Sequence, residues 1–117
     1  LAVAALGTVF YSRDIFLVLA AGLAGSPFIS PFIGRVNACG MDGMKLFSEV
    51  RKMYDFYNIK SVVIAASIKN VYDAVQAVCA GADSLALTYE VFNQLFSHPL
   101  TEQGIEKFTA DYRAING

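Results

Sequence analysis

Short apolar runs alternate along the chain with longer amphipathic stretches, and this alternation predicts a repeated strand–helix order. Each apolar run is too short for a helix, and the stretch that follows it has apolar residues three and four positions apart. The apolar runs are residues 1–9, 27–33, 61–66 and 84–87. The amphipathic stretches are residues 13–24, 43–57, 70–80 and 90–97, with a last helix expected from about residue 101 to residue 115.

This order predicts an α/β fold with parallel strands, because strands joined through helices run in the same direction. The run Val62-Val63-Ile64-Ala65-Ala66 is apolar throughout, as expected of a strand buried on both faces. The expected strands are spaced like the units of an eight-stranded (β/α) barrel, which average about 31 residues. Four such units make half a barrel, and an open four-stranded sheet of the flavodoxin type is the alternative.

The composition narrows the class of protein. A chain of 117 residues forms one domain, here residues 1–117, and 56% apolar residues argue against disorder. Charged residues make up only 16% of the chain, and the net charge is −1, so no field recruits nucleic acid or an anionic membrane surface. The apolar excess favours strands covered on both faces, a large subunit interface, or a further part of the same core outside this chain.

Two other features bear on the compartment and on metal binding. Residues 15–34 carry no charge, but Pro27 and Pro31 interrupt them, so we expect a helix and a buried strand rather than a membrane span. Cys39 and Cys79 fit neither a disulfide framework nor a metal-ligand spacing. The sequence therefore predicts a cytoplasmic protein without a metal site.

Candidate chemistry lies just past the apolar runs, because function in parallel α/β folds sits at the carboxyl ends of the strands. Arg35 and Lys69 follow the second and third runs, and the hydroxyl residues Thr8, Ser30 and Ser67 lie nearby. Two cations with hydroxyls suit a small phosphate, and residues 67–70 lead into a helix whose free N–H groups favour an anion. Strand-end capping with surface ion pairs is the alternative interpretation.

Five segments then resemble the transaldolase and fructose-6-phosphate aldolase family. Residues 28–35 read Phe-Ile-Ser-Pro-Phe-Ile-Gly-Arg, close to the Ser-Pro-Phe-Val-Gly-Arg signature of transaldolases. Residues 65–70, 81–87 and 97–108 are similar to the family's Ala-Ser-Phe-Arg/Lys-Asn, Gly-Cys/Ala-Asp-x-Leu-Thr-Ile and His-Pro-Leu-Thr-Asp-x-Gly-Ile segments. Residues 6–11 resemble the fifth strand of the aldolases. The segments follow the family's order and span nearly the whole chain.

The resemblance implies that the chain is the carboxyl-terminal half of a (β/α)8 barrel, strands five to eight, followed by a carboxyl-terminal helix. Family members form a Schiff base between a lysine on strand four and a ketose phosphate, assisted by an aspartate on strand one and a glutamate on strand three. No segment of this chain matches those strands, so we expect the isolated chain to be inactive. The family needs no cofactor.

The resemblance also assigns roles to individual residues. Arg35, Ser67 and Lys69 are expected to hold the substrate phosphate. At the position of Lys69, transaldolases often have arginine, whereas the smaller aldolase-like members of the family have lysine. Thr8 is expected to position the catalytic water, and Ser30 and Phe32 to line the site beside the sugar. Phe32 favours transfer of a dihydroxyacetone unit, since tyrosine at this position accompanies simple aldol cleavage in the family.

These expectations lead to a transaldolase-like function in sugar phosphate metabolism, with a fructose-6-phosphate aldolase-type lyase or a non-catalytic phosphate-binding half-barrel as alternatives. A four-stranded phosphate-binding domain without aldolase ancestry is a further one. The expected partners are a sugar phosphate and either a second copy of the chain or the amino-terminal half of the barrel, because open sheet edges leave backbone groups unpaired. Lys69 is the one lysine expected on the catalytic edge, and phosphate binding is favoured over a nucleophilic role for it.

Overall fold

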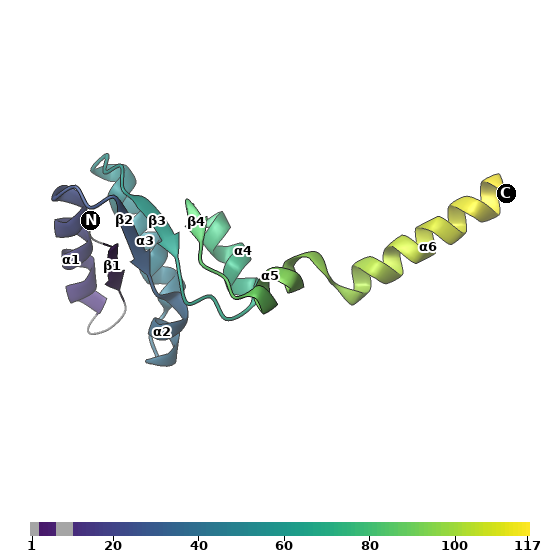
Figure 1. Ribbon diagram of the computed structural model, residues 1–117, viewed down its shortest axis with the longest axis horizontal. Coiled ribbons are helices and arrows are strands. Elements are labelled where there is room, and N and C mark those ends of the chain that lie inside the picture. Colours follow the sequence, from purple (N-terminus) through teal and green to yellow (C-terminus); the bar gives the residue numbers. More distant parts are fainter. Residues whose placement is uncertain (1–2, 7–10) are drawn as a thin grey trace.

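The computed structural model of the chain describes residues 3–6 and 11–117, which form an α/β structure with strands and helices in alternation (Figure 1). Thr8 and the residues next to it lie outside this description. The strands are β1 (Val3–Leu6), β2 (Phe28–Pro31), β3 (Val62–Ala65) and β4 (Ser84–Leu85). The helices are α1 (Tyr11–Leu23), α2 (Ile33–Ala38), α3 (Gly43–Phe56), α4 (Val71–Cys79), α5 (Tyr89–Phe96) and α6 (Pro99–Asn116).

The described strands form one parallel sheet in the order β1-β2-β3-β4. The register pairs Phe28 with Val62 in β2–β3 and Ile64 with Ser84 in β3–β4. The expected parallel α/β class is therefore confirmed. A strand order that follows the sequence is the order of a barrel, whereas a flavodoxin-type sheet reverses its order at a switch point.

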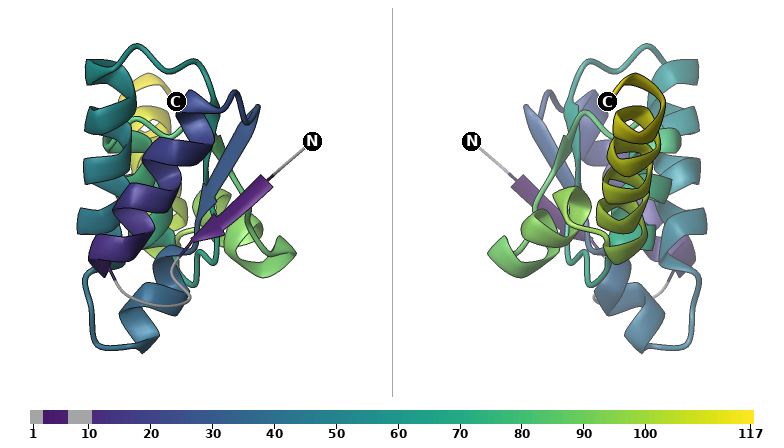
Figure 2. Two further views of the ribbon diagram at one scale, coloured as in Figure 1. Left: turned by 90° about the vertical axis from the view of Figure 1, so that its left-hand side faces the viewer. Right: turned by 90° about the vertical axis from the view of Figure 1, so that its right-hand side faces the viewer.

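Helices cover one face of this sheet. In Figure 2, α1 and α3 lie side by side on the same side of the strands, and α3 is in turn in contact with α4. The core lies between this helical layer and the sheet. Its fully buried side chains include Ile29 of β2, Val63 of β3, and Phe47 and Val50 of α3. The apolar positions of α3 thus face the sheet, as their helical spacing predicts.

The opposite face of the sheet is more open, which corrects the expectation of a third strand buried on both faces. Val63 and Ala65 of β3 are buried, but Val62 and Ile64 between them are only half-buried. Successive residues of a strand point to opposite faces, so the half-buried pair lies on the face away from the helices. Phe28, the register partner of Val62, is 38% exposed. The face of β3 away from the helices is therefore only partly covered.

Three boundaries differ from the sequence prediction. The second strand ends at Pro31, and Ile33 begins α2, a short helix in a segment predicted as strand and loop. The last helix begins at Pro99 rather than at about residue 101. His98 is its N-cap, since the imidazole Nδ1 accepts from the Leu100 N–H at 3.1 Å, and proline at the first helical position has no N–H to lose.

The helix α6 extends away from the rest of the molecule (Figure 1). With α6 included, the structure measures 65 × 30 × 22 Å along its principal axes. None of its residues is buried. Its apolar residues recur at helical spacing and form one stripe. We call this the α6 stripe: Ile105, Phe108, Tyr112 and Ile115, all more than half exposed.

Within the described part of the chain, no helix has the length and apolar character needed to cross a membrane. This agrees with the interpretation of residues 15–34 as two separate elements, since α1 ends at Leu23 and β2 begins at Phe28.

Tyr54 ties α3 to α1 through a buried hydrogen bond. Its hydroxyl donates to the Val18 carbonyl oxygen at 2.8 Å, and the side chain is fully buried. Burial raises the pKa of Tyr54 from 10.0 to about 12, with the positive charge of Arg51 opposing the shift. The folded state therefore holds this proton more tightly than the unfolded chain does.

A pH dependence of stability follows for Tyr54. The proton's contribution is fully present below the unfolded pKa of 10.0 and is lost as the pH rises toward the folded pKa of about 12. We expect the free energy of unfolding, measured by urea denaturation, to fall over this range. In Tyr54→Phe the fall should be smaller, on a baseline lowered by about 1 kcal/mol for the lost hydrogen bond. An identical pH profile in the variant would contradict this account.

Candidate functional site

The carboxyl ends of β2 and β3 lie side by side and bring together two segments, one that carries Arg35 and another that carries Ser67 and Lys69. Beyond the strands, Phe32 pairs with Ala66 as an isolated bridge, and the Ile33 N–H donates to the Ala66 carbonyl oxygen at 2.9 Å. The Gly34 N–H then donates to the Ser67 carbonyl oxygen at 3.0 Å. The segment that carries Arg35 is thereby joined to the segment that carries Ser67 and Lys69.

Gly34 is the point of closest approach between the two segments. A methyl group at Gly34 would lie 2.1 Å from the Ser67 carbonyl oxygen, 2.9 Å from Ser67 Oγ and 3.0 Å from Lys69 Cγ. Both the hydroxyl of Ser67 and the stem of Lys69 therefore lie against Gly34, next to Arg35 in the chain. Gly34 follows β2, and Ser67 and Lys69 follow β3, so this contact lies at the carboxyl-end edge of the sheet.

Ser67 adopts an uncommon backbone conformation. Its φ of 57° is in the left-handed region, where a residue other than glycine costs of order 1 kcal/mol. The turn aims the Ser67 carbonyl at the Gly34 N–H and leaves the side chain half-buried. Strained residues of this kind cluster at functional sites, and this one lies against Gly34, the residue before Arg35, and two positions before Lys69.

Arg35 and Lys69 are exposed, and Arg35 has an aromatic partner. The guanidinium carbon of Arg35 lies 5.0 Å from the centroid of the Phe32 ring, a cation–π distance. Lys69 lacks the burial that activates a Schiff-base lysine. The exposure of both cations suits binding of an anion that arrives from solvent.

The amino terminus of α4 is less favourable for binding an anion than its position predicts. Asn70 is the N-cap, and its Oδ1 accepts from the Asp73 N–H at 2.8 Å. Asp73 lies in the first turn, where its carboxylate already offsets the positive end of the helix dipole, and it accepts from Asn70 Nδ2 at 3.0 Å. An anion at this edge would therefore depend on Arg35, Ser67 and Lys69 rather than on the helix.

The remaining predicted residues have different surroundings. Ser30 lies in β2 opposite Ala5 of β1 and is 7% exposed, so little of it is accessible to a ligand from solvent. Phe32 is half-buried beside it. Thr8 is outside the described residues. Among the described residues, no group of three His, Cys, Asp or Glu side chains is placed to hold a metal ion.

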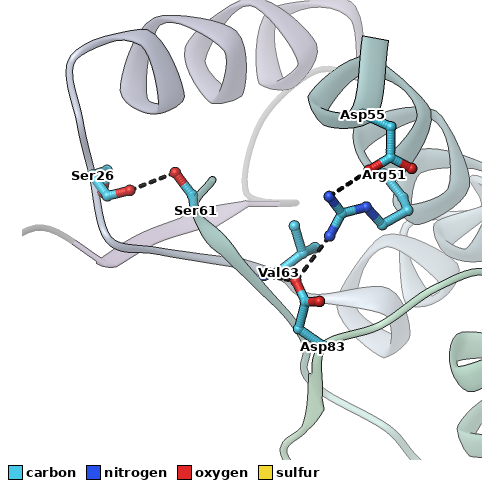
Figure 3. Close-up of polar contacts among 6 residues, drawn as sticks. All are labelled: Ser26, Arg51, Asp55, Ser61, Val63 and Asp83. Carbon is cyan, nitrogen blue, oxygen red and sulfur yellow. Dashed lines mark hydrogen bonds and ion pairs between the residues drawn. The ribbon is translucent and has the colours of Figure 1, made fainter. Parts of the chain in front are cut away.

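Sequence reasoning missed a polar network at the opposite, amino-terminal edge of the sheet (Figure 3). One oxygen of Asp83 accepts from Arg51 Nη1 at 2.8 Å and from the Val63 N–H at 2.9 Å. Arg51 also pairs with Asp55 at 2.7 Å, and the Ser61 hydroxyl donates to the Ser26 carbonyl at 2.5 Å. Arg51 and Asp83 are 32 residues apart in sequence, so no local motif reveals their contact.

A cavity of about 270 Å³ opens beside this network, lined by Arg51, Asp55, Asn58, Lys60 and Asp83 among others. It lies at the ends from which the strands start. In parallel α/β sheets, ligands bind outside the carboxyl ends of the strands. The hydrogen bond between Val63 of β3 and Asp83, the residue before β4, links the two strands here. The candidate site remains at the other edge.

Fold and site together define an α/β protein whose parallel strands present two cations and a hydroxyl at their carboxyl ends. A family model described as Transaldolase/Fructose-6-phosphate aldolase matches residues 5–117. The chain belongs to this family, and the resemblance found in its sequence is confirmed.

Individual relatives agree with the family model. Proteins named "Probable transaldolase" from Carboxydothermus hydrogenoformans and Leptospira biflexa are 45% and 44% identical over 97 and 98 residues. These alignments cover 83% and 84% of this chain but 45% and 46% of the relatives. A third, from Phenylobacterium zucineum, is 46% identical over 94 residues, covering 80% of this chain and 43% of the relative. The chain thus spans under half the length of these curated relatives.

Proposed function

We propose that this chain is the carboxyl-terminal half of a (β/α)8 barrel and supplies the phosphate-binding part of a transaldolase-type enzyme. The whole enzyme would transfer a dihydroxyacetone unit between sugar phosphates through a lysine Schiff base, with that lysine outside this chain. The sequential strand order and the helical layer on one face support the half-barrel. Phe32, where tyrosine would favour aldol cleavage, supports transfer over a fructose-6-phosphate aldolase-type lyase.

The observation that carries the proposal is the approach of Gly34, the residue before Arg35, to Ser67 and Lys69. A phosphate at this edge would meet the guanidinium fork of Arg35, the ammonium of Lys69 and the hydroxyl of Ser67. Phosphate oxygens accept several hydrogen bonds at once, which matches three donors from two adjacent segments. Ser30 and Phe32, nearer the sheet, would then face the sugar.

Phosphate binding can be tested directly on the 117-residue chain. We expect inorganic phosphate and fructose 6-phosphate to bind, and fructose to bind far more weakly. Arg35→Met should weaken phosphate binding about tenfold, since a charged hydrogen-bond partner is lost. The matched control is Lys52→Met, which removes a charge from an exposed position on α3. Equal affinities in the two variants would contradict the proposed site.

The origin of the Schiff base has its own test. With fructose 6-phosphate and sodium borohydride, we expect the chain alone to gain no mass, because Lys69 is exposed. A trapped adduct would contradict the placement of the catalytic lysine outside the chain. Its loss in Lys69→Arg would then identify Lys69 as the nucleophile. Phosphate binding without an adduct, even after the other barrel strands are supplied, would favour a non-catalytic phosphate-binding module.

The proposal includes a protein partner. The half-exposed face of the sheet and the outer strands β1 and β4 would pair with the amino-terminal half of the barrel or with a second copy of the chain. The α6 stripe would pack on a neighbouring subunit. Both described cysteines, Cys39 and Cys79, are free thiols, which suits the cytoplasm as the compartment.

A single charge tests the role of the α6 stripe. Phe108 is 73% exposed, and we expect Phe108→Glu to shift the chain toward a smaller species in light scattering coupled to gel filtration. The reason is that a carboxylate would be buried in an apolar interface without a partner. Ala110→Glu, on the opposite side of the same helix, is the control and should leave the mass unchanged. A monomeric wild-type chain would remove this part of the proposal.

A further inference from the structure

Phe32 and Arg35 form a pair at the junction between β2 and α2. The guanidinium of Arg35 lies over the Phe32 ring at 5.0 Å, where the negative face of the ring attracts a cation. The two residues are three positions apart: Phe32 is the N-cap of α2, and Arg35 is the third residue of this six-residue helix.

Phe32 is more constrained by its surroundings than Arg35 is. The backbone of Phe32 pairs with Ala66, and the next two N–H groups donate to the carbonyls of Ala66 and Ser67. Phe32 is half-buried, whereas Arg35 is exposed. A flexible arginine in solvent loses rotamer freedom when it binds an anion, and a partner that already restrains it lowers that cost.

We propose that Phe32 is a positioning residue that acts through Arg35. Its ring holds the guanidinium at the edge of the sheet where Ser67 and Lys69 lie, so that the fork is in place before a phosphate arrives. This inference rests on the proposed phosphate-binding function and gives Phe32 a role besides lining the sugar. Any residue without an aromatic face at this position would leave Arg35 free to move away.

The test compares the affinity of the 117-residue chain for inorganic phosphate, measured by phosphorus NMR titration, across variants of Phe32. Phe32→Leu should weaken binding about three- to tenfold, the range of a cation–π contact. Phe32→Tyr keeps the ring face and should bind within about twofold of the wild type. Inorganic phosphate carries no sugar, so a loss of affinity for it cannot come from contacts between Phe32 and the sugar.

Phosphate affinity measured in the Arg35→Met variant distinguishes this inference from the proposed function. In Arg35→Met, the further change Phe32→Leu should have no effect on phosphate affinity, because the ring acts only through the guanidinium. If Arg35→Met weakens binding and Phe32→Leu does not, the positioning role is wrong while the phosphate site stands. If Arg35→Met binds as the wild type does, or the wild type does not bind, both are wrong.

A spectroscopic measurement covers the case in which Phe32→Leu does not fold. In the wild-type chain, the Arg35 Nε–H resonance, assigned by its loss in Arg35→Met, should show an upfield ring-current shift and a nuclear Overhauser contact to the Phe32 ring. An Arg35 resonance at an ordinary position without that contact would overturn the proposal.

Discussion

Replacing Gly34 with alanine is expected to destabilise the chain by about 3 kcal/mol and to abolish phosphate binding at the candidate site. The added methyl group would lie 2.1 Å from the Ser67 carbonyl oxygen, well inside van der Waals contact. The neighbouring atom is backbone rather than a flexible side-chain end, so the β2–α2 and β3–α4 segments would have to separate. Separation also breaks the hydrogen bond from Gly34 to Ser67.

Gly104→Ala provides a matched control for this prediction. Gly104 lies within α6 with nothing within 4 Å of an added methyl group, so alanine should be neutral or stabilise the helix by up to about 1 kcal/mol. Urea denaturation measures both variants, and an unchanged slope with a shifted midpoint identifies a pure stability change. A Gly34→Ala chain as stable as the wild type would show that the two segments do not approach as closely as the structure has them.

The close approach at Gly34 could not be predicted from the sequence, although most of the secondary structure could. Hydrophobic periodicity placed the helix at residues 70–80, and the structure has α4 over Val71–Cys79. It placed another at residues 43–57, where α3 runs over Gly43–Phe56. These elements bury one apolar side each, and that pattern is local.

The helix α2 escaped prediction for a physical reason. It has six residues, including Gly34 and Asn37, which are weak helix formers. Its formation depends on packing, since Ile33 and Val36 are 1% exposed, and the Asn37 side chain accepts from the Gly43 N–H at 2.8 Å. The spacing of Ile33 and Val36 was the available signal, but the preceding strand's apolar run concealed it.

The candidate site, too, could be predicted only in part from the sequence. The rule that ligands bind at the carboxyl ends of strands pointed to the segments with Arg35 and Lys69, and the family resemblance then assigned phosphate binding to Arg35, Ser67 and Lys69. Their relation to Gly34 and the stacking of Arg35 on Phe32 depend on the register between β2 and β3 and on the left-handed turn at Ser67. The apolar pattern decides which face of the sheet a residue takes, but the contact between residues so far apart in the sequence arises only when the strands pair.

A second prediction of large effect concerns Asp83 at the amino-terminal edge of the sheet, where one carboxylate oxygen accepts hydrogen bonds from two donors. Asp83→Ala would remove the acceptor of the Val63 N–H and the partner of Arg51, whose side chain is only 14% exposed. The Val63 N–H would lose its hydrogen-bond acceptor at a partly buried position, and Arg51 would retain its ion pair with Asp55. We expect a loss of about 2 kcal/mol in the free energy of unfolding, moderated by the 46% exposure of Asp83.

Two variants separate the parts of this effect. Asp83→Asn keeps an oxygen for the Val63 N–H but removes the charge, so about half of the loss should remain. Asp55→Ala breaks the other contact of Arg51, and since Asp55 is 68% exposed it should cost under about 1 kcal/mol. Phosphate affinity should stay unchanged in all three variants, because the network lies at the opposite edge from Arg35 and Lys69. Equal losses in Asp83→Ala and Asp55→Ala would mean that the bond to Val63 contributes nothing, and that Asp83 does not fasten β4 to β3.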